Sequence, residues 1–249
     1  DHRDLHLSIR RQRQMCIRDR YLVYCSELVL DEGIFPHTNA GNLTKNEMQE
    51  LKKTNVSMGV MLENVSERLR RKGMPHENAP SKEPLARLEV LNNAGMLKIP
   101  MTTGILVGIG ETFEEIIDSI FTIRQIHEKF GNIQEIILQN FHPKPDTIMS
   151  NYQTPSELYF KMVVALCRII IPKANIQIPP NLSPYSYQEF LTSGINDWGG
   201  ISPITSDYVN PEFNWPKIDT VKENCKKLNF ELKARFPVYP EFIPLVNND

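Results

Sequence analysis

The chain has 249 residues, a length that fits one α/β barrel or two compact domains rather than a single small module. Lys plus Arg number 28 and Asp plus Glu number 30, so the net charge of −2 argues against a nucleic-acid partner. Hydrophobic residues make up 41% of the sequence, enough for a packed core, yet no apolar run approaches the roughly 18 residues of a membrane span. Without a secretory signal or paired cysteines, a reduced cytoplasmic setting with no membrane association is expected.

The first twenty residues differ in texture from the rest. They are rich in arginine and lack apolar periodicity and helix caps. A basic arm is one interpretation. A non-native extension is favoured, because RQMCIRDR resembles translated sequencing-adapter sequence. The expected organisation is an extension over 1–20, a partial barrel over 21–215, and a C-terminal helix and tail over 216–249, in a chain truncated at its N-terminus.

Strand-like apolar runs alternate with amphipathic helical patterns from residue 21 onward. Strands are predicted at 33–37, 55–62, 99–107, 134–139, 175–178 and 198–202. Helices are predicted at 21–31, 44–53, 64–72, 84–95, 113–130, 155–171 and 185–193. This alternation indicates βα units and a parallel sheet. The predicted fold is α/β, a partial (βα)8 TIM-type barrel that lacks its first strands, with an open doubly wound sheet as the alternative.

Several predicted helices carry recognisable end signals. Three Thr-x-x-Glu pairs predict capping boxes: Thr44 with Glu47, Thr112 with Glu115, and Thr154 with Glu157. Gly131 predicts the C-terminal end of the helix over 113–130, in which isoleucines recur at helical spacing. The closing stretch FPVYPEFIP is expected to pack on the barrel as a tail.

Polar and Gly/Pro-rich motifs follow the predicted strands. They are PHTNAG at 36–41, MLENVSERL at 61–69, GILVGIGE at 104–111, QNFHPKP at 139–145, QIPPNL at 177–182 and GINDWGG at 194–200. In a barrel, active sites are built at the carboxyl ends of the strands. Six such motifs in register therefore predict a ligand-binding enzyme.

GILVGIGE is the most informative of these motifs. Gly108 and Gly110 let the backbone approach a flat ligand, and Glu111 stands just beyond the strand. A plain βα turn is the alternative interpretation. Phe113 occupies the third glycine position of a dinucleotide fingerprint, so that fingerprint is not supported. The histidines lack metal-ligand spacing, and no metal site is predicted.

Together the motifs resemble those of the radical S-adenosylmethionine (SAM) enzymes and, more narrowly, the subunit 1 family of the FO synthases. The resemblance runs from about residue 21 to 210 and rests on PHTNAG, SMGVMLENVSERL, PHENAPSKEP, KIPMTTGILVGIGET, IQEIILQNFHPKP, IQIPPNL and GINDWGGISPIT. It implies a (βα) barrel holding SAM and a 4Fe-4S cluster, which together generate a 5′-deoxyadenosyl radical. It also implies a small-molecule substrate, the adduct of a tyrosine-derived carbon unit and 5-amino-6-ribitylaminouracil made by partner subunit 2. Radical cyclisation with loss of ammonia then gives 7,8-didemethyl-8-hydroxy-5-deazariboflavin.

The resemblance also implies roles for individual residues. Glu63 would face the SAM ribose, Arg87 would pair with the SAM carboxylate, and Gly108, Gly110 and Glu111 would lie by the adenine. From the residues alone, Glu63 is equally a helix-start carboxylate and Arg87 a surface helix residue. Candidates to bind the uracil and ribityl groups are His37, Asn39, Asn140, His142, Gln177, Asn181, Asn196 and Asp197. Trp198 could pack on a substrate ring or in the core. No catalytic residue is identified.

One departure from the family pattern concerns the cluster. The family holds it with a CxxxCxxC loop, which this sequence lacks. Cys16 and Cys25 have the wrong spacing, and Cys167 lies in an apolar helical run that predicts core packing. No metal ligand is therefore predicted here, and the chain as given is expected to be inactive. Alternatives are the partner subunit, a radical SAM enzyme of the futalosine route, a non-catalytic binding barrel, and a cluster-free lyase or aldolase barrel.

Overall fold

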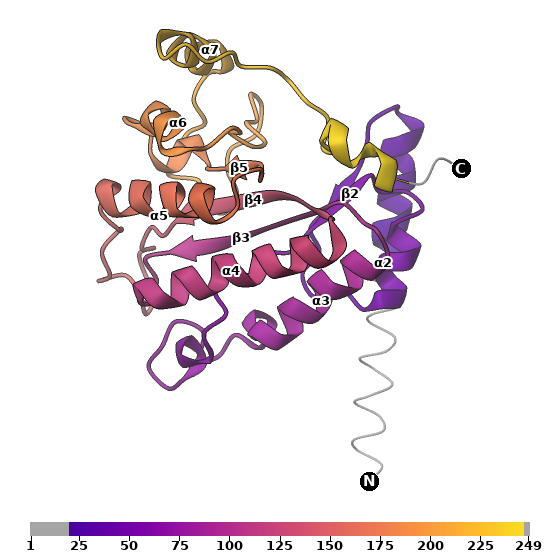
Figure 1. The fold of residues 1–249 in the computed structure, drawn as a ribbon, viewed down its shortest axis with the longest axis horizontal. Coiled ribbons are helices and arrows are strands. Elements are labelled where there is room, and N and C mark those ends of the chain that lie inside the picture. The colour runs from indigo at the N-terminus through magenta and orange to yellow at the C-terminus, as the bar shows by residue number, and fades with distance from the viewer. Residues whose placement is uncertain (1–19, 247–249) are drawn as a thin grey trace.

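The computed structural model describes residues 20–246 and consists of one parallel sheet with helices packed against it (Figure 1). The strands are β1 (His37–Thr38), β2 (Ser57–Gly59), β3 (Met101–Val107), β4 (Ile133–Asn140) and β5 (Ile176–Gln177). Residues 20–31 are helical, and the later helices are α2 (Lys45–Leu51), α3 (Pro84–Met96), α4 (Phe113–Phe130), α5 (Glu157–Ile170), α6 (Phe190–Ser193) and α7 (Ile218–Lys227). Short 3-10 helices are η1 (Glu67–Arg70), η2 (Pro80–Lys82), η3 (Pro180–Leu182), η4 (Tyr187–Glu189) and η5 (Pro240–Leu245). The predicted extension lies outside this range, except for residue 20.

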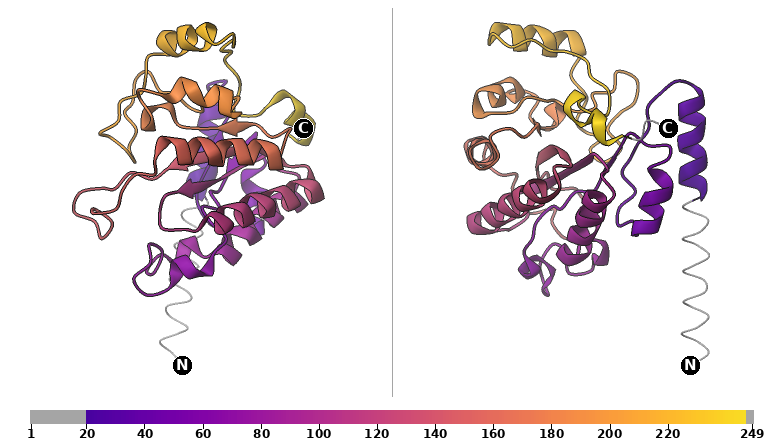
Figure 2. Two further views of the ribbon diagram at one scale, coloured as in Figure 1. Left: turned by 60° about the vertical axis from the view of Figure 1, so that its left-hand side comes forward. Right: turned by 45° about the vertical axis from the view of Figure 1, so that its right-hand side comes forward.

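The strands follow one another across the sheet in the order β1-β2-β3-β4-β5, and all neighbouring pairs are parallel. Helices α2 to α5 cover one face of the sheet, which curves around the opposite face (Figure 2). Sequential order with helices on one face is the arrangement of a barrel wall, whereas a doubly wound sheet has helices on both faces. The predicted partial barrel is therefore confirmed, and the open doubly wound alternative is wrong.

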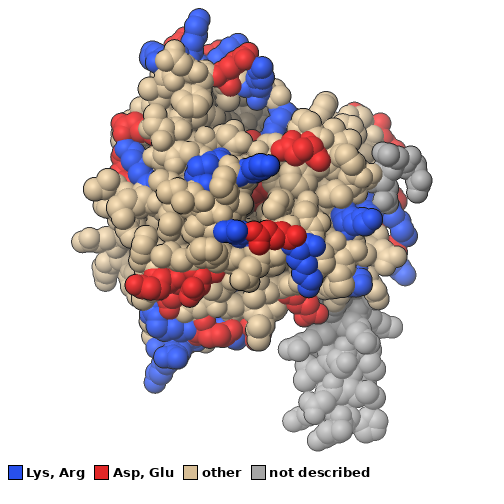
Figure 3. Space-filling model, viewed as in Figure 1, with Lys and Arg blue, Asp and Glu red and all other residues tan. Residues whose placement is uncertain are grey.

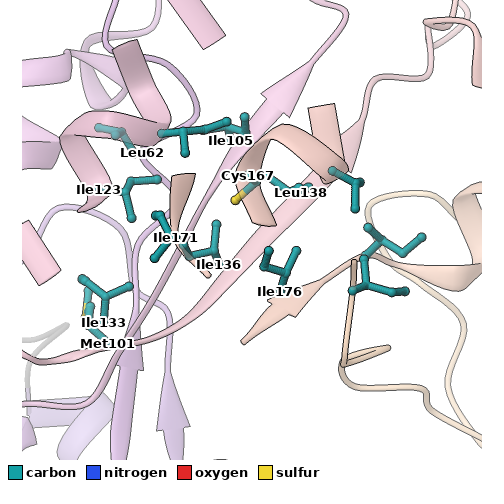
Figure 4. Close-up of a cluster of buried hydrophobic side chains, with 14 of the residues drawn as sticks. Leu62, Met101, Ile105, Ile123, Ile133, Ile136, Leu138, Cys167, Ile171 and Ile176 are labelled. Carbon is teal, nitrogen blue, oxygen red and sulfur yellow. The ribbon is translucent and has the colours of Figure 1, made fainter. Parts of the chain in front are cut away.

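A hydrophobic core fills the space between the sheet and the helices (Figure 4). Ile136 and Leu138 of β4 point into this core beside Ile123 of α4 and Cys167 of α5. The isoleucines predicted to form one stripe on α4 are all buried: Ile116, Ile120, Ile123 and Ile126. Cys167 is also fully buried, so the interpretation of this cysteine as core is confirmed.

The alternating residues of the strands face the other way, on what we call the inner face, the side of the sheet opposite the helices. Glu135 pairs with Thr102 across β4 and β3, and the side chains of these two residues are hydrogen-bonded. Gln177 forms a parallel bridge with Asp197 on the same side. Because side chains alternate along a strand, this face is polar where the core face is apolar.

Two of the three predicted capping boxes are confirmed. Thr44 with Glu47 and Thr112 with Glu115 each form both hydrogen bonds of the box. The prediction for Thr154 is wrong: Ser156 caps α5 by accepting from the backbone N–H of Tyr159. The ring of Pro155 packs so closely under Gly108 that a Cβ on that glycine would lie 2.6 Å from it. This contact holds Pro155 ahead of the helix, which therefore begins two residues later.

Six other predicted elements differ from the structure. Residues 198–202 form no strand, because the carboxylate of Asp197 accepts from the backbone N–H of Gly199 (2.5 Å) and turns the chain. Residues 64–72 contain the 3-10 helix η1 rather than an α-helix, and 185–193 divide into η4 and α6. The strands predicted at 55–62 and 175–178 shorten to three and two paired residues, and the strand predicted at 33–37 is displaced to His37–Thr38.

The last described segment returns across the sheet after α7. The side chains of Ser57 and Gln134 both donate hydrogen bonds to the carbonyl of Pro237, and Asn175 donates to Glu241. All three donors stand where strands begin, so η5 lies at the end of the sheet opposite the strand arrowheads (Figure 1). In residues 20–246, no helix combines the length and the apolar character needed to cross a membrane.

Gly131 ends α4 in the left-handed conformation, with φ of 67°, as the sequence predicts. We expect Gly131→Ala to lower the free energy of unfolding by about 1 kcal/mol, because a Cβ is disfavoured in this conformation. Gly131→Asn should cost less, since asparagine tolerates the left-handed region. Urea titration measures both variants, and equal stability of Gly131→Ala and the parent would contradict the expectation.

Candidate functional site

Glu63 stands at the carboxyl edge of the sheet, where the chain leaves β2 and runs on beside β3. Its backbone N–H donates to Gly104 (2.8 Å), and its carbonyl accepts from Leu106 (3.1 Å). These bonds hold Glu63 at φ of 64°, a left-handed conformation unusual for glutamate. Its carboxylate is buried and contacts Lys82 Nζ and His76 Nε2, the latter at 3.4 Å. Strained residues of this kind cluster at functional sites.

Arg87 lies in the first turns of α3 and is buried, so the interpretation as a surface helix residue is wrong. Its Nε donates to the carbonyl of Ser81 (2.6 Å), and its Nη1 donates to the carbonyl of Met61. Within residues 20–246, Nη2 has no hydrogen-bond partner. Burial lowers the pKa of the Arg87 guanidinium. The result is a fixed cation with one donor nitrogen free, suited to a carboxylate.

The GILVGIGE motif forms the loop between β3 and α4. Gly108 and Gly110 have φ of 99° and 100°, which side-chain-bearing residues rarely adopt. The Glu111 carboxylate accepts from the backbone N–H groups of Gly108 (2.7 Å) and Ile109 (2.8 Å). Glu111 therefore shapes the loop that presents the backbone, and its carboxylate is engaged within its own motif.

Arg68 joins this loop to the chain that follows Glu63. Its Nε and Nη2 donate to the two carboxylate oxygens of Glu115 (2.8 and 2.7 Å), and Nη2 also donates to the Gly110 carbonyl. The Arg68 hydrogen bonds lower the pKa of Glu115 to about 2. Sequence reasoning missed Arg68, His76 and Lys82, although all three fall within motifs that carry the family resemblance.

His37 is the first residue of the two-residue strand β1, and Asn39 follows the strand. The Nδ1 of His37 is 2.7 Å from the Ser57 hydroxyl. Gly59 leaves space beside both candidates, because a Cβ there would lie 3.1 Å from His37 Nε2 and 3.5 Å from Asn39. Both residues are exposed overall, and burial of the His37 ring nitrogens with the nearby Arg235 cation lowers the pKa of His37 to about 4.

Asn140, His142 and Asn181 are brought together at the carboxyl ends of β4 and β5. Asn140 Nδ2 and His142 Nε2 lie 3.1 and 3.0 Å from the carbonyl of Leu182, the residue after Asn181. The amide of Asn181 donates to Asp207 (2.9 Å). The Oδ1 atoms of both asparagines are buried without a partner. Asn140 and His142 line a cavity of about 190 Å³, which Asn181 does not line.

Asn196 and Asp197 are adjacent in sequence but contact different parts of the molecule. The Asn196 side chain contacts the backbone N–H of Ile176 (2.7 Å) and the Asn175 amide (2.8 Å). Asp197 accepts from Arg235 (2.5 Å), which also donates to Glu135. These contacts place the Asp197 carboxylate at the amino-terminal part of the inner face, away from the carboxyl edge.

Gln177 packs against position 199 so closely that a Cβ there would lie 1.9 Å from its Nε2. Trp198 is buried, meets the Tyr187 ring edge-on at 5.2 Å, and donates to Cys225 Sγ. Its packing is that of a core residue.

The donor chemistry fits SAM at one end of the site and does not fit an iron–sulfur cluster. A buried carboxylate and a fixed guanidinium match a ribose diol and an amino-acid carboxylate. The described cysteines Cys25, Cys167 and Cys225 stand on different helices, and burial raises the pKa of the Cys167 thiol to about 12. Among residues 20–246 there is no group of three His, Cys, Asp or Glu side chains that could hold a metal. Cys16 lies outside the described residues.

Charged side chains of both signs are interspersed over the face shown in Figure 3. No broad basic surface is visible on this face. This distribution agrees with the near-neutral net charge of the sequence.

Solved structures with a similar fold place the chain in a class. The methylornithine synthase PylB aligns with 86% of this chain and 64% of its own, at a TM-score of 0.69 and 17% identity. HydG, a maturase of the [FeFe]-hydrogenase, aligns with 72% of this chain and 42% of its own, at a TM-score of 0.63 and 18% identity. This chain therefore shares its fold with part of each of these two proteins. No protein-family model matches the sequence.

Curated relatives define the family. The chain is 52% identical over 225 residues to a protein of Methanococcus maripaludis strain C6, covering 90% of this chain and 63% of the relative. It is 46% identical over 247 residues to one of Methanocaldococcus jannaschii, covering 98% and 69%. Both relatives are named 7,8-didemethyl-8-hydroxy-5-deazariboflavin synthase. The chain belongs to this synthase family, and it spans about two thirds of the length of these relatives.

Proposed function

We propose that the chain carries the SAM-binding and substrate-binding part of a radical SAM synthase that forms 7,8-didemethyl-8-hydroxy-5-deazariboflavin. The substrate would be the adduct of a tyrosine-derived unit and 5-amino-6-ribitylaminouracil, cyclised with loss of ammonia. The observation that carries the proposal is the pairing of strained, buried Glu63 with the fixed guanidinium of Arg87 at the carboxyl edge, in a chain of this family.

Different residues of the proposed site would bind different parts of SAM. Arg87 would bind the amino-acid carboxylate through its free Nη2, while two backbone carbonyls hold its plane. Glu63 would accept hydrogen bonds from the ribose hydroxyls. Gly108 and Gly110 would let the backbone lie flat against the adenine. When bound, SAM supplies the 5′-deoxyadenosyl group that abstracts hydrogen in this enzyme class.

The substrate would meet polar groups from two places. His37 lies in β1 and Asn39 directly after it, and the Oδ1 atoms of Asn140 and Asn181 are unpaired acceptors near the ends of β4 and β5. Acceptors of this kind suit the N–H groups of a uracil and the hydroxyls of a ribityl chain. A cytoplasmic setting, a 4Fe-4S cluster in the family's complete enzyme and a partner subunit 2 that supplies the adduct belong to the same proposal.

SAM binding tests the site directly. We expect isothermal titration calorimetry to show SAM binding by the full chain and a loss of at least about 10-fold in affinity for Arg87→Met, because a charge-assisted hydrogen bond is removed. Arg124→Met is the matched control, since Arg124 forms an exposed ion pair with Glu128 on α4 and lies over the exposed Phe121 ring. Equal affinities of the Arg87 and Arg124 variants would contradict the assignment.

A further inference from the structure

Both oxygens of the Glu63 carboxylate already have partners in this structure. Oε1 is bonded to Lys82 Nζ, and Oε2 lies 3.4 Å from His76 Nε2. Only 11% of the Glu63 side chain is exposed, against 32% of the Lys82 side chain. The carboxylate proposed to receive the SAM ribose is therefore covered by a lysine that can still reach solvent.

Lys82 and His76 belong to one connection, the 71–83 loop, which joins η1 to α3 and contains η2. The same loop supplies the Ser81 carbonyl that accepts from Arg87 Nε. Its path is anchored by the backbone bond from His76 to Leu69 (2.8 Å). One loop thus contacts both residues proposed to bind SAM, the carboxylate through two side chains and the guanidinium through a backbone carbonyl.

Charge explains why the Lys82 contact is reversible. Two basic side chains, His76 and Lys82, contact the carboxylate of Glu63, and the Arg87 cation acts on both of them. Burial and the Arg87 cation lower the pKa of Lys82 to about 8, and they also lower the pKa of His76 below its usual range. A competing ligand can displace Lys82 because its side chain is 32% exposed and its ammonium lies beside a second cation, Arg87.

We propose that Lys82 acts as a latch on the SAM site: its ammonium occupies the place of the ribose hydroxyls on Glu63 and leaves when SAM binds. The inference rests on the proposed function, since it needs Glu63 to receive SAM. Displacing Lys82 frees one contact of the 71–83 loop, so that loop changes its contacts with the site when SAM is bound. Lys82 is a positioning residue in this scheme and takes no part in chemistry.

The latch predicts that removing the lysine charge strengthens SAM binding. We expect Lys82→Met to bind SAM about 3- to 10-fold more tightly than the parent at pH 7, because no latched population has to open first. Lys82→Arg keeps the cation and should bind like the parent. Lys72→Met is the matched control, because Lys72 is an exposed lysine of the same loop with no ion pair.

The pH dependence gives a second readout. With a pKa of about 8, Lys82 is largely protonated at pH 7 and largely neutral at pH 9. The other groups that face it are the Glu63 carboxylate, the His76 imidazole, whose pKa lies below its usual range, and the Arg87 guanidinium. The affinity advantage of Lys82→Met should therefore fall to less than about 2-fold at pH 9. The SAM amino group titrates in both samples and cancels from this ratio.

Each outcome of the calorimetry is decisive. Tighter binding by Lys82→Met that disappears at pH 9 supports the latch. Equal affinity of parent and Lys82→Met contradicts the latch alone, and weaker binding by Lys82→Met shows that the lysine contacts SAM directly. If parent, Lys82→Met and Lys72→Met all fail to bind SAM, the proposed SAM site is wrong and the latch fails with it.

Discussion

Replacing Gly104 with alanine is expected to lower the free energy of unfolding by about 3 kcal/mol or more, because the new methyl group meets backbone that has no room to move. Gly104 lies in the middle of β3, where a Cβ would stand 2.0 Å from the carbonyl oxygen of Ile137 and 2.9 Å from its carbon. β3 and β4 form the most extensive pairing of the sheet, so the clash separates its central strands.

Gly104→Ala is expected to affect SAM binding as well as stability. The carbonyl of Gly104 accepts the backbone hydrogen bond that holds Glu63. Displacement of β3 therefore also moves the Glu63 side chain, which is proposed to bind the SAM ribose. Chemical denaturation measures the stability loss, and calorimetry with SAM measures the effect on binding. Gly200→Ala is the control, since a Cβ at position 200 meets nothing within 4 Å. A loss below about 1 kcal/mol for Gly104→Ala would show that the strands separate easily.

Arg235→Gln is expected to lower the free energy of unfolding by about 2–4 kcal/mol, because it leaves two buried carboxylates without their cation. Arg235 donates to Glu135 (2.6 Å) and Asp197 (2.5 Å), and its guanidinium carbon lies 4.2 Å from the centre of the Tyr239 ring. The side chains of Glu135 and Asp197 are only 7% and 12% exposed. The control Arg124→Gln breaks an exposed pair and should cost less than about 0.5 kcal/mol.

The loss of unfolding free energy caused by Arg235→Gln should become smaller as the pH falls from 7 to 5. Burial raises the pKa of Glu135, and neighbouring Asp197 raises it further while Arg235 opposes the rise. A raised pKa means that the folded chain binds this proton more tightly than the unfolded chain, so acid favours the folded state. Removing Arg235 strengthens that preference. A second substitution, Asp197→Asn, should recover part of the loss at pH 7, and strict additivity of the two changes would contradict the network.

Sequence patterns predicted the parts of this molecule that depend on neighbours along the chain. The cap at Thr112, the end of α4 at Gly131 and the buried isoleucine stripe are all local signals, and all are confirmed. The alternation of strands and helices predicted the parallel sheet for the same reason. The motifs of the carboxyl edge also predicted which residues to inspect, because the loops after parallel strands meet at one edge.

Local sequence signals were misleading where contacts with other parts of the chain, or a neighbouring side chain, changed the backbone. Thr154 and Ser156 can both cap a helix, and packing of Pro155 under Gly108 decided between them. The run 198–202 has strand-like residues, but the side chain of Asp197 turns the chain before a strand can form.

Sequence patterns were therefore sufficient for the class of fold and for the family, and they predicted a site at the carboxyl edge of the sheet. The pairing of charges follows from the folded chain alone. Lys82 meets Glu63 because the 71–83 loop folds back on the end of β2, and Arg235 meets Glu135 across 100 positions of sequence. Such pairs depend on strand register and on which face each side chain takes, which neither spacing nor composition encodes, whereas caps and stripes need only one turn of chain.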